Sequence, residues 1–272
     1  ALAALSGAGV PNFRTPEACA DAIAAALGRR SPAASLRQAT SQSAAKKTAE
    51  RGATATAGIL DELASGARLD RLGIPRPPAV ALDADIARVP DLPFPYPVAL
   101  KILSGEIAHK TDVGGVALGI GDAATLMTHM QRMRAEVAQR IPALRLQRVL
   151  VQPMISGLGE VLIGYRIDRD VGPLIMLAAG GVLAEIDRDR SLRLAPVDLD
   201  TAREMIAEVR ALIALAGYRG KAKGDLEALA QAIVALSQLA SEADVAEAEI
   251  NPLIVRPAGE GVVAVDALVR LV

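Results

Sequence analysis

The clearest chemical signal in the sequence is a lysine in an expected strand, followed by a loop that carries a histidine. Residues 98–103 are apolar apart from Lys101, residues 116–120 are apolar again, and His109 lies between them. This pattern predicts a strand, a polar loop and a second strand. Because an unpaired buried charge is costly, Lys101 is expected to face an anion, with phosphate as the first candidate. A neutral imidazole can be a nucleophile, a general base or a metal ligand near pH 7, although a solvated loop with an incidental histidine would show the same pattern.

Side chains with oxygen donors gather near the C-terminal end of the sequence. Alternation along an expected strand places Glu247, Glu249 and Asn251 on one face, and a returning strand brings Asp266 near them. Carboxylate and amide oxygens are the ligands that Mg²⁺ prefers, with water and substrate phosphates in its other positions. A solvent-facing row of acids is the alternative. The pair Asn251 and Pro252 favours the metal site, because a strand that must end in such a kink directs a specific side chain.

A third candidate site is the glycine-rich connection at residues 217–225, between two expected helices. It holds Arg219, Lys221 and Lys223 among three glycines. Such a loop can bind an anion through its side chains and its free backbone N–H groups. A solvated connection between helices is equally compatible with this composition.

Composition excludes several classes of protein. The chain has 272 residues, of which 51% are hydrophobic, enough for one large domain or two smaller ones. Aromatic residues make up 2% and the net charge is −1, which argues against a nucleic-acid binder. Cys19 is the single cysteine, which excludes an internal disulfide and a cysteine zinc site. No apolar run reaches the length of a membrane span, so a cytoplasmic protein without membrane contact is expected.

Helix signals divide the first third of the chain. Thr15 is a candidate N-cap for a helix over residues 16–27. The polar residues 31–52 that follow lack apolar periodicity and predict a flexible linker. A second, amphipathic helix is expected after Gly58, with Gly73 at its end.

The remaining two thirds alternate between strands and helices. A helix is expected after Asp122, with His129 beside its apolar stripe in a structural role. Three apolar runs then predict a meander of mostly antiparallel strands. The expected strands cover 148–155, 161–167 and 173–181, and two further helices start near Asp200 and Asp225.

Taken in order, these pieces resemble the ATP-grasp domain of the NDP-forming acyl-CoA synthetases, the acetate–CoA ligase (ADP-forming) family, which is related to the β subunit of succinyl-CoA synthetase. HKTDVGGV at residues 109–116 and EINPL at 249–253 carry the resemblance. It implies an α+β ATP-grasp fold, in which two lobes surround a nucleotide cleft. The implied domain covers 58–272, with an N-lobe over about 58–145 and a C-lobe over about 146–272. Residues 1–30 resemble the end of an upstream ligase-like domain and 31–57 a linker, so a fragment of a longer polypeptide is expected.

The resemblance also implies a reaction, in which acyl-CoA, ADP and phosphate interconvert with free acid, CoA and ATP. In the family a histidine of the CoA-binding part is phosphorylated first, and His109 matches the second histidine, on a mobile loop, that relays the phosphoryl group. Gly114 and Gly115 are expected to let this loop swing. Lys101 is implied to neutralise nucleotide phosphates, and Arg219 matches a basic position of the family. The implied Mg²⁺ ligands are Glu249, Asn251 and Asp266.

The strand that joins the two lobes is implied to read adenine through its backbone. Glu160 is expected nearby for contacts with ribose or adenine. The implied nucleotide contacts are Lys101, Gln152, Pro153, Met154, Glu160, Gly180 and Gly181. Ala178 and Ala179 depart from the family pattern, which commonly has glycine there; such changes would adjust nucleotide fit or weaken catalysis.

The implied partners are upstream CoA-binding and ligase-like domains, in the same polypeptide or in a partner subunit, and a homo-oligomer is compatible with the sequence. ATP or ADP and Mg²⁺ are the implied cofactors, whereas CoA is expected only through the upstream domains. The isolated chain is therefore not expected to complete the reaction. The alternative is a partly degenerate module that binds nucleotide without turnover, as in synthetase-like proteins fused to a lysine acetyltransferase.

Overall fold

The computed structural model describes residues 15–27, 58–107, 110–142, 144–180, 189–220 and 222–272. The first helix, α2 (Pro16–Leu27), begins after Thr15, whose hydroxyl oxygen accepts a hydrogen bond from the Ala18 N–H at 3.2 Å. This confirms the predicted N-cap. The predicted linker and most of the expected upstream remnant lie outside the described residues. None of the helices in the described ranges combines the length and the apolar character that a membrane crossing requires.

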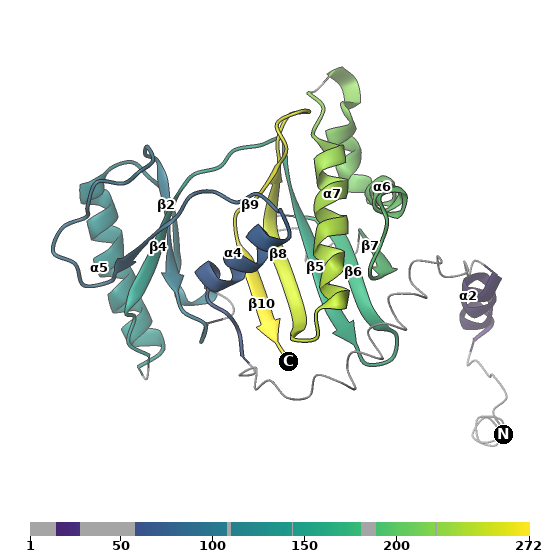
Figure 1. Cartoon of the computed structure of the whole chain (residues 1–272), viewed down its shortest axis with the longest axis horizontal. Coiled ribbons are helices and arrows are strands. Elements are labelled where there is room, and N and C mark those ends of the chain that lie inside the picture. Colours follow the sequence, from purple (N-terminus) through teal and green to yellow (C-terminus); the bar gives the residue numbers. More distant parts are fainter. Residues whose placement is uncertain (1–14, 28–57, 108–109, 143, 181–188, 221) are drawn as a thin grey trace.

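A four-stranded antiparallel sheet forms one lobe, which we call the four-stranded lobe (Figure 1). Its strands, in the order β1-β4-β2-β3, are β1 (Val80–Asp83), β2 (Val98–Leu103), β3 (Val116–Ile120) and β4 (Arg148–Pro153). Helix α5 (Ala123–Arg140) covers one face, and Asp122 caps it by accepting a hydrogen bond from the Thr125 N–H. The predicted stripe of α5 is buried against Leu100 and Ile102 of β2. Strand alternation therefore turns Lys101 toward the opposite face.

A larger antiparallel sheet forms the six-stranded lobe, in the order β10-β8-β5-β6-β7 with β9 paired to β8. Helices α6 (Leu199–Glu208) and α7 (Leu226–Ser237) cover one face of it (Figure 1). Helix α4 (Glu62–Arg71) also belongs to this lobe, because Leu69 is buried in its core. The strands are β5 (Gly159–Asp168), β6 (Gly172–Ala179), β7 (Arg190–Leu194), β8 (Val245–Val255), β9 (Val262–Ala264) and β10 (Ala267–Leu271). Short 3₁₀ helices lie at Thr111–Val113, Arg210–Ala216, Tyr218–Gly220 and Gln238–Ser241.

The sheet topology corrects the predicted meander and the predicted lobe boundary. Strand β4 pairs with β1 and β2 and not with β5, so the four-stranded lobe extends to Pro153 and the change of lobe falls after 153, not at 145. The segment before residue 75 belongs to the six-stranded lobe, since the Leu60 N–H donates to the Val269 carbonyl oxygen at 2.9 Å. An apolar run predicts a buried strand but does not specify which sheet buries it.

The helix expected near Asp200 is short. Helix α6 ends at Glu208 and a 3₁₀ helix with a tighter turn follows, so Ile213 is 54% exposed. Strand β8 does not end at Asn251 but continues through Pro252 to Val255. The returning strand is interrupted instead, between β9 and β10, and Asp266 lies in this interruption.

Candidate functional site

Four charged side chains meet where the two lobes face each other. The Lys101 ammonium donates to Glu62 Oε1 at 2.7 Å, and the Lys110 ammonium donates to Glu62 Oε2 at 2.5 Å and to Asp266 Oδ1 at 3.0 Å. Lys101 Nζ lies 3.8 Å from the same Asp266 oxygen. The group contains two positive and two negative charges, and we call it the interlobe cluster.

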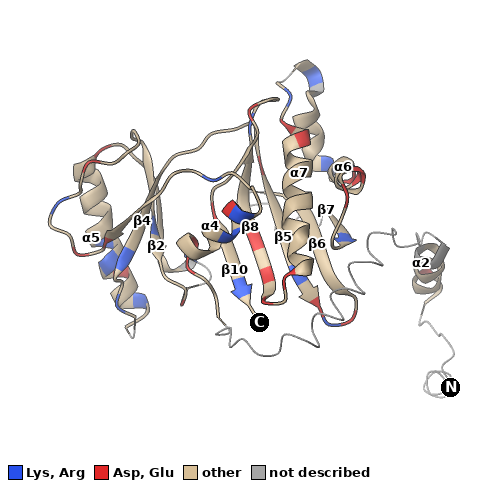
Figure 2. Ribbon diagram, in the orientation of Figure 1, with Lys and Arg blue, Asp and Glu red and all other residues tan. Residues whose placement is uncertain are grey.

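Each lobe contributes one sign of charge to the interlobe cluster. Lys101 lies on β2 and Lys110 precedes the 3₁₀ helix at Thr111–Val113, both in the four-stranded lobe. Glu62 opens helix α4, and Asp266 precedes β10, both in the six-stranded lobe. Figure 2 shows α4 between the two sheets, with acidic residues along β8 beside it. The ion pairs therefore join the two lobes to each other.

A backbone carbonyl adds an uncharged contact to this junction. The Val265 carbonyl oxygen accepts hydrogen bonds from Lys101 Nζ at 2.7 Å and from Gln152 Nε2 at 3.1 Å. Gln152 is buried and is the last residue but one of β4. Lys101 and Gln152, both predicted nucleotide contacts, thus share one acceptor in the opposite lobe.

Burial and ion pairing oppose each other in the pKa values of the cluster. Burial raises the pKa of Glu62 above its ordinary value, and the two lysines offset this only partly. Burial acts in the same direction on Asp266, but Lys101 and Lys110 outweigh it and lower the pKa of this carboxyl. Burial would lower the pKa of Lys110, yet Asp266 and Glu62 raise it. Lys110 and Asp266 are therefore both charged at neutral pH.

The three predicted metal ligands lie on neighbouring strands at the edge of the interlobe cluster. Glu249 and Asn251 share one face of β8, and Asn251 Nδ2 donates to Glu249 Oε1 at 3.3 Å. The Asn251 N–H donates to the Asp266 carbonyl oxygen at 3.1 Å, which brings the two residues next to each other. Two carboxylates and an amide are suitable donors for Mg²⁺. The described residues contain no group of three or more His, Cys, Asp or Glu side chains arranged to hold a metal ion.

The paired glycines after the loop are explained by close approach. Gly114 ends the 3₁₀ helix with a φ of 72°, and a Cβ there would contact the Glu136 carboxylate. The Gly115 N–H donates to the Lys110 carbonyl oxygen at 2.7 Å, and a Cβ at Gly115 would contact Ile102. Both glycines thus fit a tight turn that anchors the loop on β2. The expected swing of the loop stays a prediction, since His109 lies outside the described residues.

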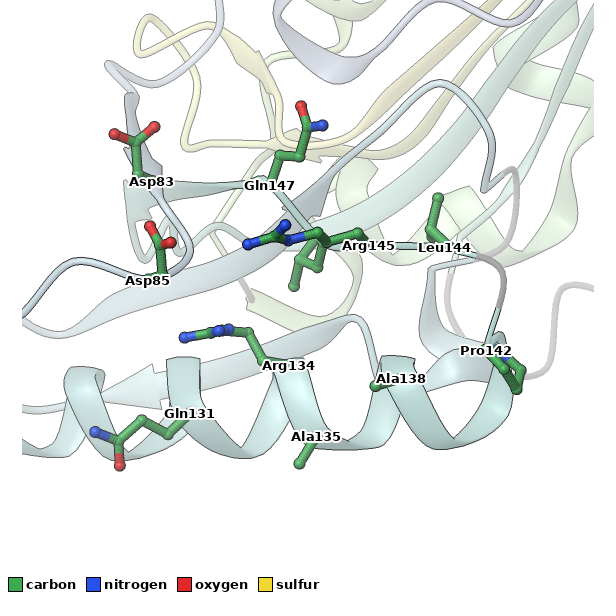
Figure 3. A pocket seen from close by; sticks show the side chains of 11 residues that line it. Asp83, Asp85, Gln131, Arg134, Ala135, Ala138, Pro142, Leu144, Arg145 and Gln147 are labelled. Carbon is green, nitrogen blue, oxygen red and sulfur yellow. The ribbon is translucent and has the colours of Figure 1, made fainter.

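A cavity lies on the other side of the four-stranded sheet. It has a volume of about 760 Å³ and is bordered by β1, α5, Pro142 and residues 144–147. Arg134 and Arg145 point into it beside Asp85 (Figure 3). Its exposed lining carries both signs of charge, and the four-stranded sheet lies between it and the face of β2 that holds Lys101. It is therefore not part of the interlobe site.

Comparison with known proteins identifies the fold around this site. A family model described as an ATP-grasp domain matches residues 51–271. The chain belongs to the ATP-grasp family. The ADP-forming acetate–CoA ligase I of Archaeoglobus fulgidus is 33% identical over 270 residues, which cover 95% of this chain and 39% of that protein. The chain thus spans about two fifths of that relative.

Two further relatives match the ATP-grasp domain over most of their own length. The β subunit of the ADP-forming acetate–CoA ligase II of Pyrococcus furiosus is 35% identical over 178 residues, which cover 65% of this chain and 75% of the subunit. A solved dinucleotide-forming acetyl-coenzyme A synthetase 1 from Ca. Korarchaeum cryptofilum aligns with a TM-score of 0.71 and 30% identity, covering 85% of this chain and all of the matched chain. The resemblance to ADP-forming acyl-CoA synthetases is confirmed.

The predicted nucleotide contacts occupy two regions of the ATP-grasp domain. Pro153 ends β4 and Met154 follows it, and the Met154 N–H donates to the Pro97 carbonyl oxygen at 3.0 Å. The residues that follow lead directly into β5, so this is the connection between the lobes. Glu160 on β5 and Gly180 after β6 lie side by side, because the Gly180 N–H donates to the Glu160 carbonyl oxygen at 2.8 Å.

The remaining predicted site residues of the ATP-grasp domain are Arg219, Gly181 and His109. Arg219 is exposed and has a φ of 54°, in a loop that packs against the turn after β8 through the hydrogen bond from the Ala258 N–H to the Lys223 carbonyl oxygen at 2.8 Å. Gly181 lies outside the described residues, as His109 does. Their roles stay predictions.

Sequence reasoning missed two members of the interlobe cluster. Glu62 stands in the first turn of an amphipathic helix, where an acid is explained by the helix dipole, so nothing in the sequence marks it. Lys110 lies next to His109 in the loop that the sequence singles out, and this position was the available signal. Both residues become part of a site only through the contact between the lobes.

Proposed function

We propose that this chain is the nucleotide-binding and phosphoryl-relaying module of an acyl-CoA synthetase, which interconverts acyl-CoA, ADP and phosphate with free acid, CoA and ATP. The observation that carries the proposal is the interlobe cluster. It places two lysines from one lobe beside the candidate metal ligands of the other, in an ATP-grasp domain. The relatives named above are ligases of this class, which favours an enzyme over a regulatory module without turnover.

The lysines supply positive charge along the path of the phosphates. Phosphoryl transfer depends mainly on positioning and on neutralising charge on the phosphate oxygens. Lys101 and Lys110 are the buried cations at the face where the two sheets meet, and Lys110 keeps its charge because its pKa is raised by Asp266 and Glu62 against the effect of burial. We assign them to the phosphates of the nucleotide.

His109 is the proposed carrier of the phosphoryl group. A nitrogen of its neutral imidazole attacks the phosphorus of the phosphohistidine on the CoA-binding part, and the P–N bond there breaks. In the second step an oxygen of the ADP β-phosphate attacks the same phosphorus, the P–N bond to His109 breaks, and ATP and neutral imidazole result. One solved relative is described as having its phosphohistidine segment pointing towards the nucleotide-binding site, which supports this assignment.

The proposed metal residues are Glu249, Asn251 and Asp266. These residues would hold Mg²⁺, which would supply positive charge to neutralise the nucleotide phosphates. The chain's own contribution is the arrangement of donors: the hydrogen bond from the Asn251 amide orients Glu249, and the bond from Lys110 orients Asp266. Substrate phosphates supply the ligands that the described residues lack.

The base and ribose of the nucleotide are assigned to the connection between the lobes. Backbone groups of Gln152, Pro153 and Met154 would contact adenine. Glu160, with Gly180 and Gly181 beside it, would contact the ribose or the base, and Arg219 would add positive charge from its exposed loop. CoA binding and the choice of acid are assigned to further domains, because the chain spans 39% of its full-length relative.

Transfer of phosphate from ATP to the chain tests this proposal. Incubated with Mg²⁺ and ATP labelled at the γ-phosphate, the purified chain should acquire label that is stable to alkali and labile to acid, as expected for phosphohistidine. His109→Asn should abolish labelling, whereas His129→Asn, which changes the other histidine on α5, should retain it. A folded chain that takes up no label, or label that persists in His109→Asn, would contradict the proposal.

A further inference from the structure

The Glu62 carboxylate accepts a hydrogen bond from the ammonium group of each of the two lysines. One of its oxygens accepts from Lys101 and the other accepts from Lys110. Lys101 uses a second proton on the Val265 carbonyl oxygen, and its side chain is 4% exposed. The ammonium of Lys101 is therefore surrounded by protein oxygens, and solvent does not reach it.

This arrangement conflicts with phosphate binding by the same lysines. A lysine that neutralises a phosphate must donate a proton to it. The exposed fraction rises from 6% for the Glu62 side chain to 29% for Asp266, so a ligand approaches from the Asp266 side. From there it meets a cluster whose charges cancel.

We propose that Glu62 is an internal counterion, which holds the place of a phosphate on Lys101 and Lys110 until a polyphosphate displaces it. The inference rests on the proposed function and names a positioning residue that acts through the two lysines. A carboxylate and a phosphate offer the same kind of charged oxygen acceptor, so the exchange leaves both ammonium groups hydrogen-bonded.

The neighbouring acid is held more firmly than Glu62. Asp266 Oδ1 accepts from Lys110 and also from the Ala267 backbone N–H at 2.9 Å. The Glu62 carboxylate accepts hydrogen bonds from the side chains of the two lysines, Lys101 and Lys110, both of which belong to the opposite lobe. Glu62 belongs to the lobe opposite the lysines, so its displacement also removes ion pairs that join the lobes. Nucleotide binding and loosening of helix α4 are therefore linked.

Binding of inorganic tripolyphosphate without Mg²⁺ tests the inference, because this probe reports on the lysines and not on the metal residues. Isothermal titration calorimetry should give about tenfold tighter binding for Glu62→Gln than for the natural chain, because a competing negative charge is removed a few ångströms from the ligand. Glu242→Gln is the matched control. It also removes an acid that is ion-paired in the six-stranded lobe, with Arg68 at 2.7 Å, and should leave the affinity unchanged.

Each outcome separates this inference from the proposed function. Unchanged or weaker tripolyphosphate binding by Glu62→Gln, with its circular dichroism spectrum intact, overturns the inference even if the chain is labelled by ATP. Tighter binding without labelling supports the counterion and contradicts the phosphoryl relay. If Glu62→Gln does not fold, hydrogen exchange of the natural chain decides: tripolyphosphate should accelerate exchange in the first turn of α4, and no acceleration would overturn the inference.

Discussion

The ammonium of Lys110 donates to Oδ1 of Asp266 across 3.0 Å, although 156 positions separate the two residues in the sequence. This contact brings the end of the loop that carries His109 to the strand end that carries the candidate metal ligands. The same aspartate lies beside Asn251 through its backbone carbonyl. The proposed phosphate-binding lysines and the proposed metal residues thus converge at one junction between the lobes.

Replacing Lys101 with methionine should weaken the binding of MgADP at least tenfold, because a positive charge is lost from the phosphate path. It also leaves the buried Glu62 carboxylate with one lysine instead of two, and breaking a buried ion pair costs about 3–5 kcal/mol. Calorimetric titration and urea denaturation measure the two effects. Arg132→Met, at a side chain that is 73% exposed, is the control and should change neither. Undiminished affinity in a folded Lys101→Met chain would remove this lysine from the site.

Asn251→Ala should abolish the part of ADP binding that depends on Mg²⁺, while binding measured in EDTA stays the same. The substitution removes one proposed ligand and the hydrogen bond at 3.3 Å that orients Glu249. Glu247→Gln is the matched control. Glu247 lies on the same face of β8, but its carboxylate forms an ion pair with Arg270 of β10 at 3.2 Å. An equal effect of the two substitutions would indicate general damage to the strand rather than loss of a metal ligand.

The stability of the folded chain should fall in acid, because protonation of Asp244 removes its ion pair with Arg68. The hydrogen bond from Arg68 lowers the pKa of Asp244 below its ordinary value. A carboxyl with a lowered folded pKa contributes stability above its unfolded pKa of about 3.9, and this contribution disappears as the pH falls through the folded pKa. Urea denaturation from pH 6 to pH 2.5 should therefore show a smaller loss of stability for Asp244→Asn than for the natural chain. Asp200→Asn, at a side chain that is 89% exposed, should follow the natural curve.

Two helix caps should differ in their contribution to stability. Asp225 accepts hydrogen bonds from the backbone N–H groups of Ala228, Gly259 and Gly261, so it caps α7 and also ties down the turn after β8. Asp198 caps α6 through Thr201. Replacement by alanine should cost about 1 kcal/mol for Asp198 and about 2 kcal/mol for Asp225, measured by urea denaturation. The free energy of unfolding of Asp225→Asn should lie between those of the natural chain and Asp225→Ala, because asparagine keeps one oxygen acceptor for the cap. Equal losses at the two positions would show that the turn contributes nothing.

Local elements could be predicted because their signals are local. The runs around Lys101 and after the loop form β2 and β3 with the expected bounds, and Asp122 and Asp225 cap the helices that follow them. Periodicity and capping depend on residues within a few positions of each other. The order of short motifs along the chain was enough to indicate the family, which the match over residues 51–271 confirms.

The assignment of elements to lobes could not be predicted in the same way. Strand β4 has the apolar pattern of its successors, yet it completes the four-stranded sheet, and helix α4 precedes that sheet in the chain but packs on the other. An apolar face must be buried against another helix or sheet, but the local sequence does not specify which one. The boundary between the lobes followed from these pairings.

By itself, the sequence determined which residues carry chemistry and which segments are helix or strand: a lysine in an apolar strand, oxygen donors on one face of another, and the caps between them. Only the tertiary structure decided what these groups face. Lys101 had to meet an anion because burying its charge alone is too costly, and both a phosphate and a carboxylate satisfy that requirement. The approach of the lobes selected Glu62, a residue 39 positions away that no local pattern connects to it.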